Sequence, residues 1–190
     1  MASYFWQGPR LELRPPTLED WEAHYANYRD TFARFLVDGE VELPVSPEQG
    51  KQIWADFIDP KATHGRLIFV MEEAATGRNV GGFNINSVDH RNGTFSIGMQ
   101  VNPDARGQGY GTEAMELALR YCFQELRLHK CNSAYTEGNA GSARMHEKLG
   151  FVMEGIRREV LYHDGRYWNE VLCGLTRAEY LARVKNRGVL

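Results

Sequence analysis

The sequence has few cysteines, no long apolar run and no leader-like start. Its three cysteines, Cys122, Cys131 and Cys173, lie far apart and form no CxxC pair or His/Cys cluster, so we expect reduced, mostly buried thiols and no metal site. No run of about 18 apolar residues could cross a membrane, and residues 1–10 lack the basic and apolar segments of a signal peptide. These absences predict a cytoplasmic protein without a membrane partner.

Positive charge is also scarce. The 22 lysines and arginines face 25 aspartates and glutamates, which gives a formal net charge of −3 and a pI of about 6.1. A protein that binds nucleic acid through its phosphates needs a basic surplus, so we expect no nucleic-acid partner, although a local basic pocket is still possible. Repeats and Pro/Ser-rich linkers are missing too, and the length suits one domain over residues 1–190.

Hydrophobic periodicity predicts a mixed α/β fold. Period-two alternation, β-rich composition and turn residues predict strands, while helical spacing behind Thr17 and Ser46 predicts two early helices. Strands followed by strand–helix–strand–helix indicate a mixed sheet with helices on its faces. The expected strands are 10–14, 65–73, 77–88, 93–101, 130–136, 154–165 and 166–176, the expected helices are 17–30, 46–58, 109–126, 139–150 and 177–185, and 37–45 is expected to be a loop.

A dense glycine loop opens the helix expected at 109–126. Gly107, Gly109 and Gly111 occupy every second position, and Arg106 precedes them. A helix N-terminus offers unpaired N–H groups and partial positive charge, and glycines let a phosphate approach them closely. The run lacks the Lys of a Walker loop and the GxGxxG spacing of a dinucleotide fingerprint. A ligand-free turn is the bland alternative; the functional interpretation is a phosphate or pyrophosphate.

Two longer motifs resemble one known family. The run RGQGYG (residues 106–111), with IGMQVNP before it, resembles the acetyl-CoA loop of the GNAT N-acetyltransferases, in their branch of ribosomal-protein N-terminal acetyltransferases. The segment EGNAGSARMHEKLGFVMEG (residues 137–155) resembles that branch's second hallmark, N-x-x-S followed by E-K-x-G-F-x-x-E-G. Motifs in family order cover residues 94–180, whereas residues 1–93 agree in pattern only.

The resemblance implies a fold, a co-substrate and a set of contacts. The fold would be a single GNAT-like α/β domain with a mixed, mostly antiparallel sheet, two splayed parallel strands and helices on both faces. Acetyl-CoA would lie between the splayed strands, with its pyrophosphate on the glycine loop. The cofactor-binding residues it implies are Met99, Gln100, Val101, Arg106, Gly107, Gln108, Gly109, Tyr110, Gly111, Thr112, Asn139 and Ser142.

The implied reaction is acetyl transfer to a primary amine by direct attack on the thioester. Ser142 matches a serine that protonates the departing thiolate, and it could equally be a local hydrogen-bonding residue in the first helical turn, next to an Asn139 N-cap. His146 departs from the branch, where its position is commonly apolar. It is either an acid–base group with a pKa near 6.5 or a partly buried histidine that fills an apolar place.

The general base is left open. Glu137 and Glu159 are the candidates, and some relatives carry a glutamate base at the position of Leu161. Glu159 would share the strand face of Leu161 if the period of two holds.

The acceptor is left open as well. In this superfamily its site lies between the early helices and the late hairpin, which here carry charged and aromatic residues, namely Asp38, Glu40, Glu42, Tyr162, Tyr167 and Trp168. They could attract a cationic amine, or they could be a solvated loop and ordinary hairpin packing. The amine could belong to a protein N-terminus, a polyamine, an amino acid or a drug, and a homodimer is allowed. The alternative function is a catalytically inactive acetyl-CoA-binding sensor or partner domain.

Overall fold

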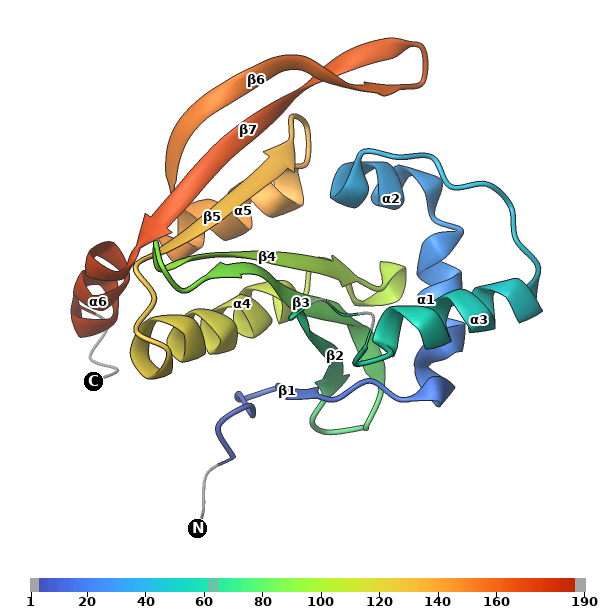
Figure 1. The fold of residues 1–190 in the computed structure, drawn as a ribbon, viewed down its shortest axis with the longest axis horizontal. Helices are drawn as coiled ribbons and strands as arrows, with labels where there is room; N and C mark the ends of the chain where they lie inside the picture. Colours follow the sequence, from blue (N-terminus) through green and yellow to red (C-terminus); the bar gives the residue numbers. More distant parts are fainter. Residues whose placement is uncertain (1–3, 62, 64, 187–190) are drawn as a thin grey trace.

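The computed structural model describes residues 4–61, 63 and 65–186, which form one seven-stranded sheet in the order β1-β2-β3-β4-β5-β7-β6 (Figure 1). The strands are β1 (Leu11–Arg14), β2 (Leu67–Glu73), β3 (Asn79–Asp89), β4 (Thr94–Val101), β5 (Lys130–Thr136), β6 (Val152–His163) and β7 (Arg166–Thr176). The helices are α1 (Trp21–Tyr28), α2 (Thr31–Asp38), α3 (Pro47–Ile58), α4 (Tyr110–Arg120), α5 (Ala140–Leu149) and α6 (Arg177–Asn186).

The sheet is mixed, as predicted. Strands β1 to β4 pair antiparallel, and β7 lies between β5 and β6 and is antiparallel to both. The parallel pair is β4 with β5, and its register covers only residues 94–96 of β4 against 130–132 of β5. The two strands therefore separate beyond Ser96, and the splayed pair expected from the resemblance is confirmed.

Alternation along β4 sends its side chains to helices on opposite faces. A Cβ atom on Gly111 of α4 would lie 3.1 Å from Met99 Sδ and 3.4 Å from Val101 Cγ2. The side chain of Gln100, between those two, instead reaches the carbonyl of Asn27 in α1. Because successive side chains of a strand point to opposite faces, α4 and α1 cover different sides of the sheet. The expected layering is confirmed.

The structure has one helix that was not predicted and two segments of another helix type than predicted. The region expected to be loop from residue 37 begins with the last turn of α2, a helix that the sequence patterns did not indicate. Asp30 caps its start through a hydrogen bond from Ala33 N, and Gly39 ends it at φ +75°. Thr17 precedes a 3₁₀ turn rather than α1 itself, and the long fourth helix finishes as a π-helical segment at Tyr121–Glu125.

The three cysteines are buried and free in the structure, as expected. Burial raises the pKa of Cys122 to about 12 and that of Cys173 to about 11. In the described part of the chain, His, Cys, Asp and Glu side chains form no group of three that could hold a metal ion. Nor does any helix among the described residues have the length and apolar character needed to cross a membrane.

Candidate active site

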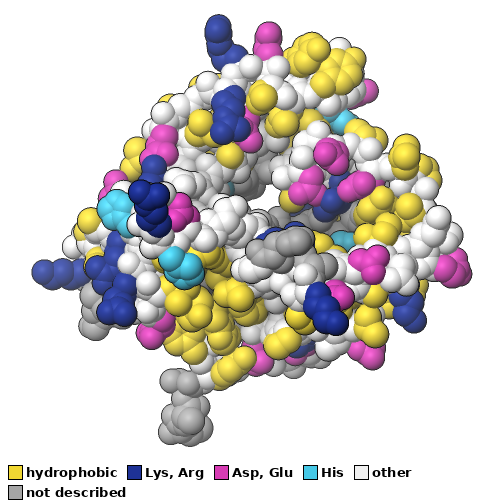
Figure 2. All heavy atoms as spheres, in the orientation of Figure 1, with side chains coloured by type: hydrophobic (Ala, Val, Ile, Leu, Met, Phe, Trp, Pro, Cys, Tyr) yellow, Lys and Arg dark blue, Asp and Glu magenta, His cyan; other side chains and the backbone are white. Residues whose placement is uncertain are grey.

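Divergence of β4 from β5 opens a cleft of about 670 Å³. Figure 2 shows a hollow near the middle of the same view, next to the region where α2 lies. The cleft is lined from β4, β5 and three helices. Its lining includes Phe32, Ala33, Leu36 and Val37 of α2, Met99, Gln100 and Val101 of β4, Arg106, Gly107, Gly109, Gly111 and Thr112 of the loop and α4, Ser133 and Tyr135 of β5, and Asn139, Ser142, Met145 and His146 of α5.

The glycine loop presents an uncapped helix start to this cleft. Gly109 is the N-cap residue of α4 at φ +89°, and among the described residues no side-chain cap hydrogen bond is made to the start of the helix. Gly107 has φ +74°, and a Cβ atom there would meet nothing within 4 Å. The first N–H groups of α4 are thus available to an anion, and Gly107 is explained by its left-handed backbone rather than by crowding.

Not every residue of the loop faces the cleft with its side chain. Gly111 lies under Met99 and Val101, so its small size serves the contact between α4 and β4. Gln108 donates from Nε2 to the carbonyl of Asp104 at 3.0 Å, and the buried Tyr110 donates from its hydroxyl to Glu73. Gln108 and Tyr110 are not among the residues that line the cleft.

Arg106 lines the cleft but already has two partners. Its Nε donates to the carbonyl of Val101 at 3.1 Å, and its Nη2 lies 2.8 Å from Asp30 Oδ2. The positive charge expected beside a phosphate is present, and it forms an ion pair with Asp30, the N-cap residue of α2.

The start of α5 forms the opposite wall. Asn139 is its N-cap residue and accepts a hydrogen bond from Ser142 N at 3.0 Å, so the predicted cap is confirmed. Both Asn139 and Ser142 line the cleft. The Ser142 hydroxyl lies 3.2 Å from His146 Nδ1.

The surroundings of His146 define its protonation state. Its Nδ1 lies 2.8 Å from the Ser142 carbonyl oxygen, which can only accept, so Nδ1 carries the proton. Its Nε2, 2.8 Å from Ser133 Oγ, then accepts from that hydroxyl. The ring is 4 % exposed, and burial lowers its pKa below the usual value. His146 is thus a neutral buried imidazole with both nitrogens occupied, which favours the structural alternative.

Ser133 is a site residue that the sequence did not single out. It lies in the middle of β5 and reaches both the cleft and His146. A serine on a half-buried strand has no sequence pattern that marks it as a site residue. Only the contact between β5 and α5 shows that Ser133 hydrogen-bonds His146.

The two candidate bases lie outside the cleft lining. Glu137 is exposed and accepts from Asn169 Nδ2 at 2.8 Å, while Glu159 N donates to Asn169 Oδ1 at 2.8 Å. The argument that placed Glu159 on the face of Leu161 was wrong: β6 is bulged between Arg157 and Leu161, and Glu159 has φ +53°. An irregular register breaks the period of two. The catalytic roles of both glutamates stay predictions.

The acidic residues expected near an acceptor gather at the end of α2. Arg34 pairs with Asp38 and, at 2.9 Å, with Glu42. Burial raises the pKa of Asp38, against the lowering effect of Arg34. Figure 2 shows acidic side chains over α2 beside the hollow. Glu40 is a third carboxylate here, and its charge also raises the pKa of Asp38.

The aromatic residues of the hairpin are divided between two environments. Tyr162 and Tyr167 contact each other edge-to-face and are mostly exposed. Trp168 instead packs 5.6 Å from Phe35 of α2, which also stacks on His163 at 4.3 Å. The hairpin therefore holds α2 in place, and its three aromatics do not form one surface.

Comparison with known proteins gives consistent results. Residues 10–152 match the family model described as "Acetyltransferase (GNAT) domain". The chain is 29 % identical, over 95 % of its length and 97 % of the relative's, to the SPbeta prophage-derived uncharacterized N-acetyltransferase YokL of Bacillus subtilis. It is 31 % identical to the Spermidine N(1)-acetyltransferase of Escherichia coli, over 52 % of each chain.

Solved structures show the same fold. Spermidine N-acetyltransferase from Vibrio cholerae, determined in complex with CoA and spermine, has a TM-score of 0.78 at 21 % identity, covering 92 % of this chain and 99 % of that one.

Proposed function

Because the chain belongs to the GNAT acetyltransferase family, we propose that it transfers the acetyl group of acetyl-CoA to a primary amine in the cleft between β4 and β5. One observation carries the proposal. The cleft has a site for an anion at the uncapped start of α4 and a hydroxyl group, that of Ser142, on its opposite wall. An anionic cofactor with a reactive far end fits both features.

The cofactor would follow the backbone. Its pyrophosphate would accept hydrogen bonds from the first N–H groups of α4 beside Arg106, where the helix dipole adds favourable potential. Its pantetheine arm would lie along Met99, Gln100 and Val101, the part of β4 that β5 does not pair. Asn139, on the far wall, would orient the arm toward Ser142.

The chemistry would need few side chains. The amine nitrogen attacks the thioester carbonyl carbon, the C–N bond forms and the carbonyl oxygen becomes an oxyanion. Collapse of this intermediate breaks the C–S bond, and the sulfur takes up a proton as the nitrogen loses one. His146 donates its Nδ1 proton to the Ser142 carbonyl, and the Ser142 hydroxyl, 3.2 Å from Nδ1, would donate its own proton to the departing sulfur. Holding the reactants in line supplies much of the acceleration.

For the acceptor we propose a cationic amine. The three carboxylates of Asp38, Glu40 and Glu42 outnumber Arg34, and the adjoining wall of α2 is apolar. Such a wall suits an alkyl chain that ends in positive charge. The relative in Escherichia coli is named for spermidine. We therefore propose a polyamine as the first acceptor to test and a protein N-terminus as the second.

A matched pair of variants tests the cofactor assignment. Gly107→Asp and Gly107→Asn both tolerate the left-handed backbone, but only aspartate adds a negative charge beside the pyrophosphate. Calorimetry should show acetyl-CoA binding weakened roughly tenfold or more in Gly107→Asp relative to Gly107→Asn, from a like-charge repulsion of about 2 kcal/mol. Equal affinity in the two would reject this placement of the pyrophosphate.

Turnover is then measured by thiol release with spermidine, an N-terminal peptide, lysine and an aminoglycoside. Release of CoA with at least one of them is the expected result. Tight acetyl-CoA binding without turnover on any amine would favour the sensor instead.

A further inference from the structure

Two side chains at the junction of α1 and α2 contact the two ends of the segment that joins β4 to α4. Asn27 lies in the last turn of α1, and Asp30 is the N-cap residue of α2. Their partners, Asn102 and Arg106, lie at either end of the turn that leads to the glycine loop. We call these four residues the corner clamp.

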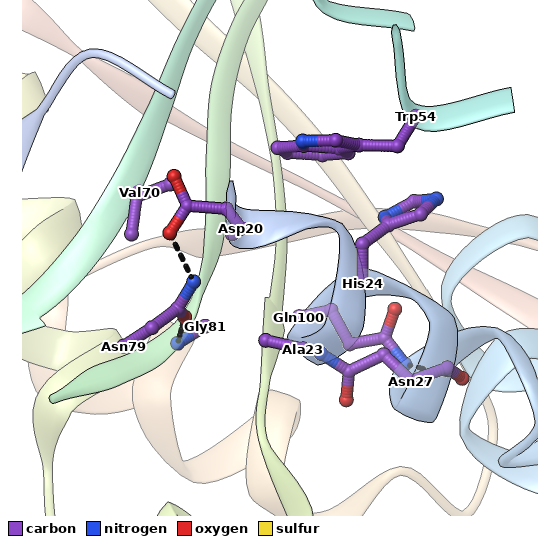
Figure 3. A pocket seen from close by; sticks show the side chains of 10 residues that line it. Asp20, Ala23, His24, Asn27, Trp54, Val70, Asn79, Gly81 and Gln100 are labelled. Atoms are coloured by element: carbon purple, nitrogen blue, oxygen red, sulfur yellow. Dashed lines mark hydrogen bonds between the residues drawn. The ribbon is translucent and has the colours of Figure 1, made fainter. Parts of the chain in front are cut away.

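The asparagine half of the clamp is buried and polar. Asn27 Nδ2 donates to Asn102 Oδ1 at 2.6 Å, and Asn102 Nδ2 donates to the carbonyl of Asn79 at 2.9 Å. Figure 3 shows Asn27 and Gln100 together at one side of a small cavity, which has a volume of about 50 Å³. Buried amides that bond each other fix the point at which the chain leaves β4.

The charged half connects the loop to α2. Asp30 uses Oδ1 to accept from Ala33 N at 3.2 Å, which caps α2, and Oδ2 to pair with Arg106 at 2.8 Å. Arg106 is also held by Val101 O through Nε. A guanidinium has five N–H donors, so three remain for a phosphate while both contacts persist.

The helix that Asp30 caps, α2, forms the wall of the cleft next to the acidic residues. Phe32, Ala33, Leu36 and Val37 line the cleft, and the helix ends near Asp38. The Asp30 carboxylate therefore links Arg106, which is proposed to bind the cofactor, to α2, which is proposed to border the acceptor. Because 27 % of the Asp30 side chain and 41 % of the Arg106 side chain are exposed, the ion pair adds little to global stability.

We propose that Asp30 is a positioning residue that couples cofactor binding at the glycine loop to the ordering of α2. The inference rests on the proposed function, because the pyrophosphate must bind next to Arg106. A bound pyrophosphate holds the Arg106 guanidinium in one position, and the pair with Asp30 passes that restraint to the first turn of α2. By linkage, an ordered α2 favours cofactor binding by the same factor.

Hydrogen exchange with CoA as the only added ligand tests the coupling. In the wild type, CoA should slow exchange in residues 102–112 and also in α2, there by roughly fivefold or more. Asp30→Asn keeps an N-cap acceptor but loses the charge. In this variant residues 102–112 should still be protected, whereas α2 should respond less than about twofold. Asp30→Ala, which also loses the cap, should show faster α2 exchange even without CoA.

Each result decides something. Two results would overturn the coupling but leave the proposed function intact. In the first, CoA slows exchange in α2 equally in the wild type and in Asp30→Asn. In the second, CoA slows exchange in residues 102–112 of the wild type but not in α2. A wild-type loop that gains no protection would reject the cofactor assignment, and the coupling with it. Arg106→Gln gives a second route, since it should remove the α2 response from the other side of the pair.

Discussion

The two ends of the cleft are built differently. The proposed cofactor end consists mainly of backbone groups, and its loop and helix start come from the consecutive residues 106–112. The proposed acceptor end is lined by side chains of α2. The β6–β7 hairpin packs against this helix, although the two lie more than a hundred residues apart in the sequence. Phe35 joins these parts by stacking on His163 at 4.3 Å.

This contrast has a physical consequence. A backbone site depends on local conformation, so it tolerates changes in distant packing. A side-chain site between distant elements depends on how those elements pack. Damage to packing should therefore weaken amine binding more than cofactor binding.

Phe35→Ala should separate the two ends most strongly. Phe35 is fully buried, and its removal leaves a cavity under the hairpin that should cost about 3–5 kcal/mol of unfolding free energy. Urea denaturation measures the loss, and Phe35→Leu should cost less than about 1.5 kcal/mol. In the folded fraction, KM for the amine should rise while the affinity for acetyl-CoA stays within about twofold. A parallel loss of cofactor affinity would contradict the division.

Ser142→Ala should act on chemistry alone. The backbone N of residue 142 keeps its bond to Asn139, so α5 stays capped, but the hydroxyl proposed to protonate the sulfur is lost. We expect kcat to fall roughly 100-fold, about 2.7 kcal/mol, with little change in KM for acetyl-CoA. An unchanged kcat would leave Ser142 with a structural role only.

Variants of His146 refine that prediction. His146→Asn retains an amide donor where Nδ1 stands, whereas His146→Gln retains a partner for Ser133 but no donor toward Ser142. The asparagine variant should keep more of kcat than the glutamine variant. Burial lowers the pKa of His146, so its titration should lie below pH 6.5. The pH profile of kcat near pH 6.5 should therefore have the same shape in the wild type and in His146→Asn.

Acid should lower the free energy of unfolding through a histidine of α1. Burial lowers the pKa of His24, whose ring centroid lies 4.7 Å from that of Trp54, from 6.5 to about 4. Between these pH values the unfolded chain binds more protons than the native one, so stability present above pH 6.5 is lost as the pH falls to 4. The loss should be roughly 2 kcal/mol.

Urea unfolding at pH 7 and pH 4.5 measures this effect, with His24→Gln as the control. The variant lacks the titration, so its unfolding free energy should change less between the two pH values. The same pH dependence in both proteins would show that other groups cause the loss.

Arg34→Met should give the smallest effect and the opposite sign. Arg34 pairs with Asp38 and Glu42, and its loss frees both carboxylates at the acceptor end. KM for spermidine should fall about two- to fivefold at low salt, because exposed charges contribute less than about 1 kcal/mol. Arg91→Met, in the turn between β3 and β4, makes the same change in net charge far along the chain and should leave KM unchanged. Equal responses would mean that α2 does not border the amine.

Much of the fold could be predicted from the sequence, and the reasons are local. The strand β5 was predicted with its bounds of Lys130–Thr136, and Ser46 forms the expected cap of α3 with Pro47 in its first turn. The turn of the last hairpin has φ +50° at Asp164 and +76° at Gly165, as its sequence suggests. Each feature depends on a few neighbouring residues.

The failures have one cause in common. The helix α2 was missed because its buried residue, Phe35, is stabilised by a hairpin over a hundred residues away. The period-two argument for Glu159 failed because the irregular register of β6 depends on pairing with β7. Ser133 was overlooked because its partner His146 lies on another element.

The sequence by itself determined the conformation of the proposed cofactor end. Glycine spacing, an arginine and a helix start specify a helix N-terminus whose N–H groups carry no side-chain cap, and this conformation is encoded within a few residues. The tertiary structure decided the rest: the neutral state of His146, the pairing of Arg106 with Asp30 and the wall made by α2. These depend on distances between side chains remote in the chain, which no local pattern specifies.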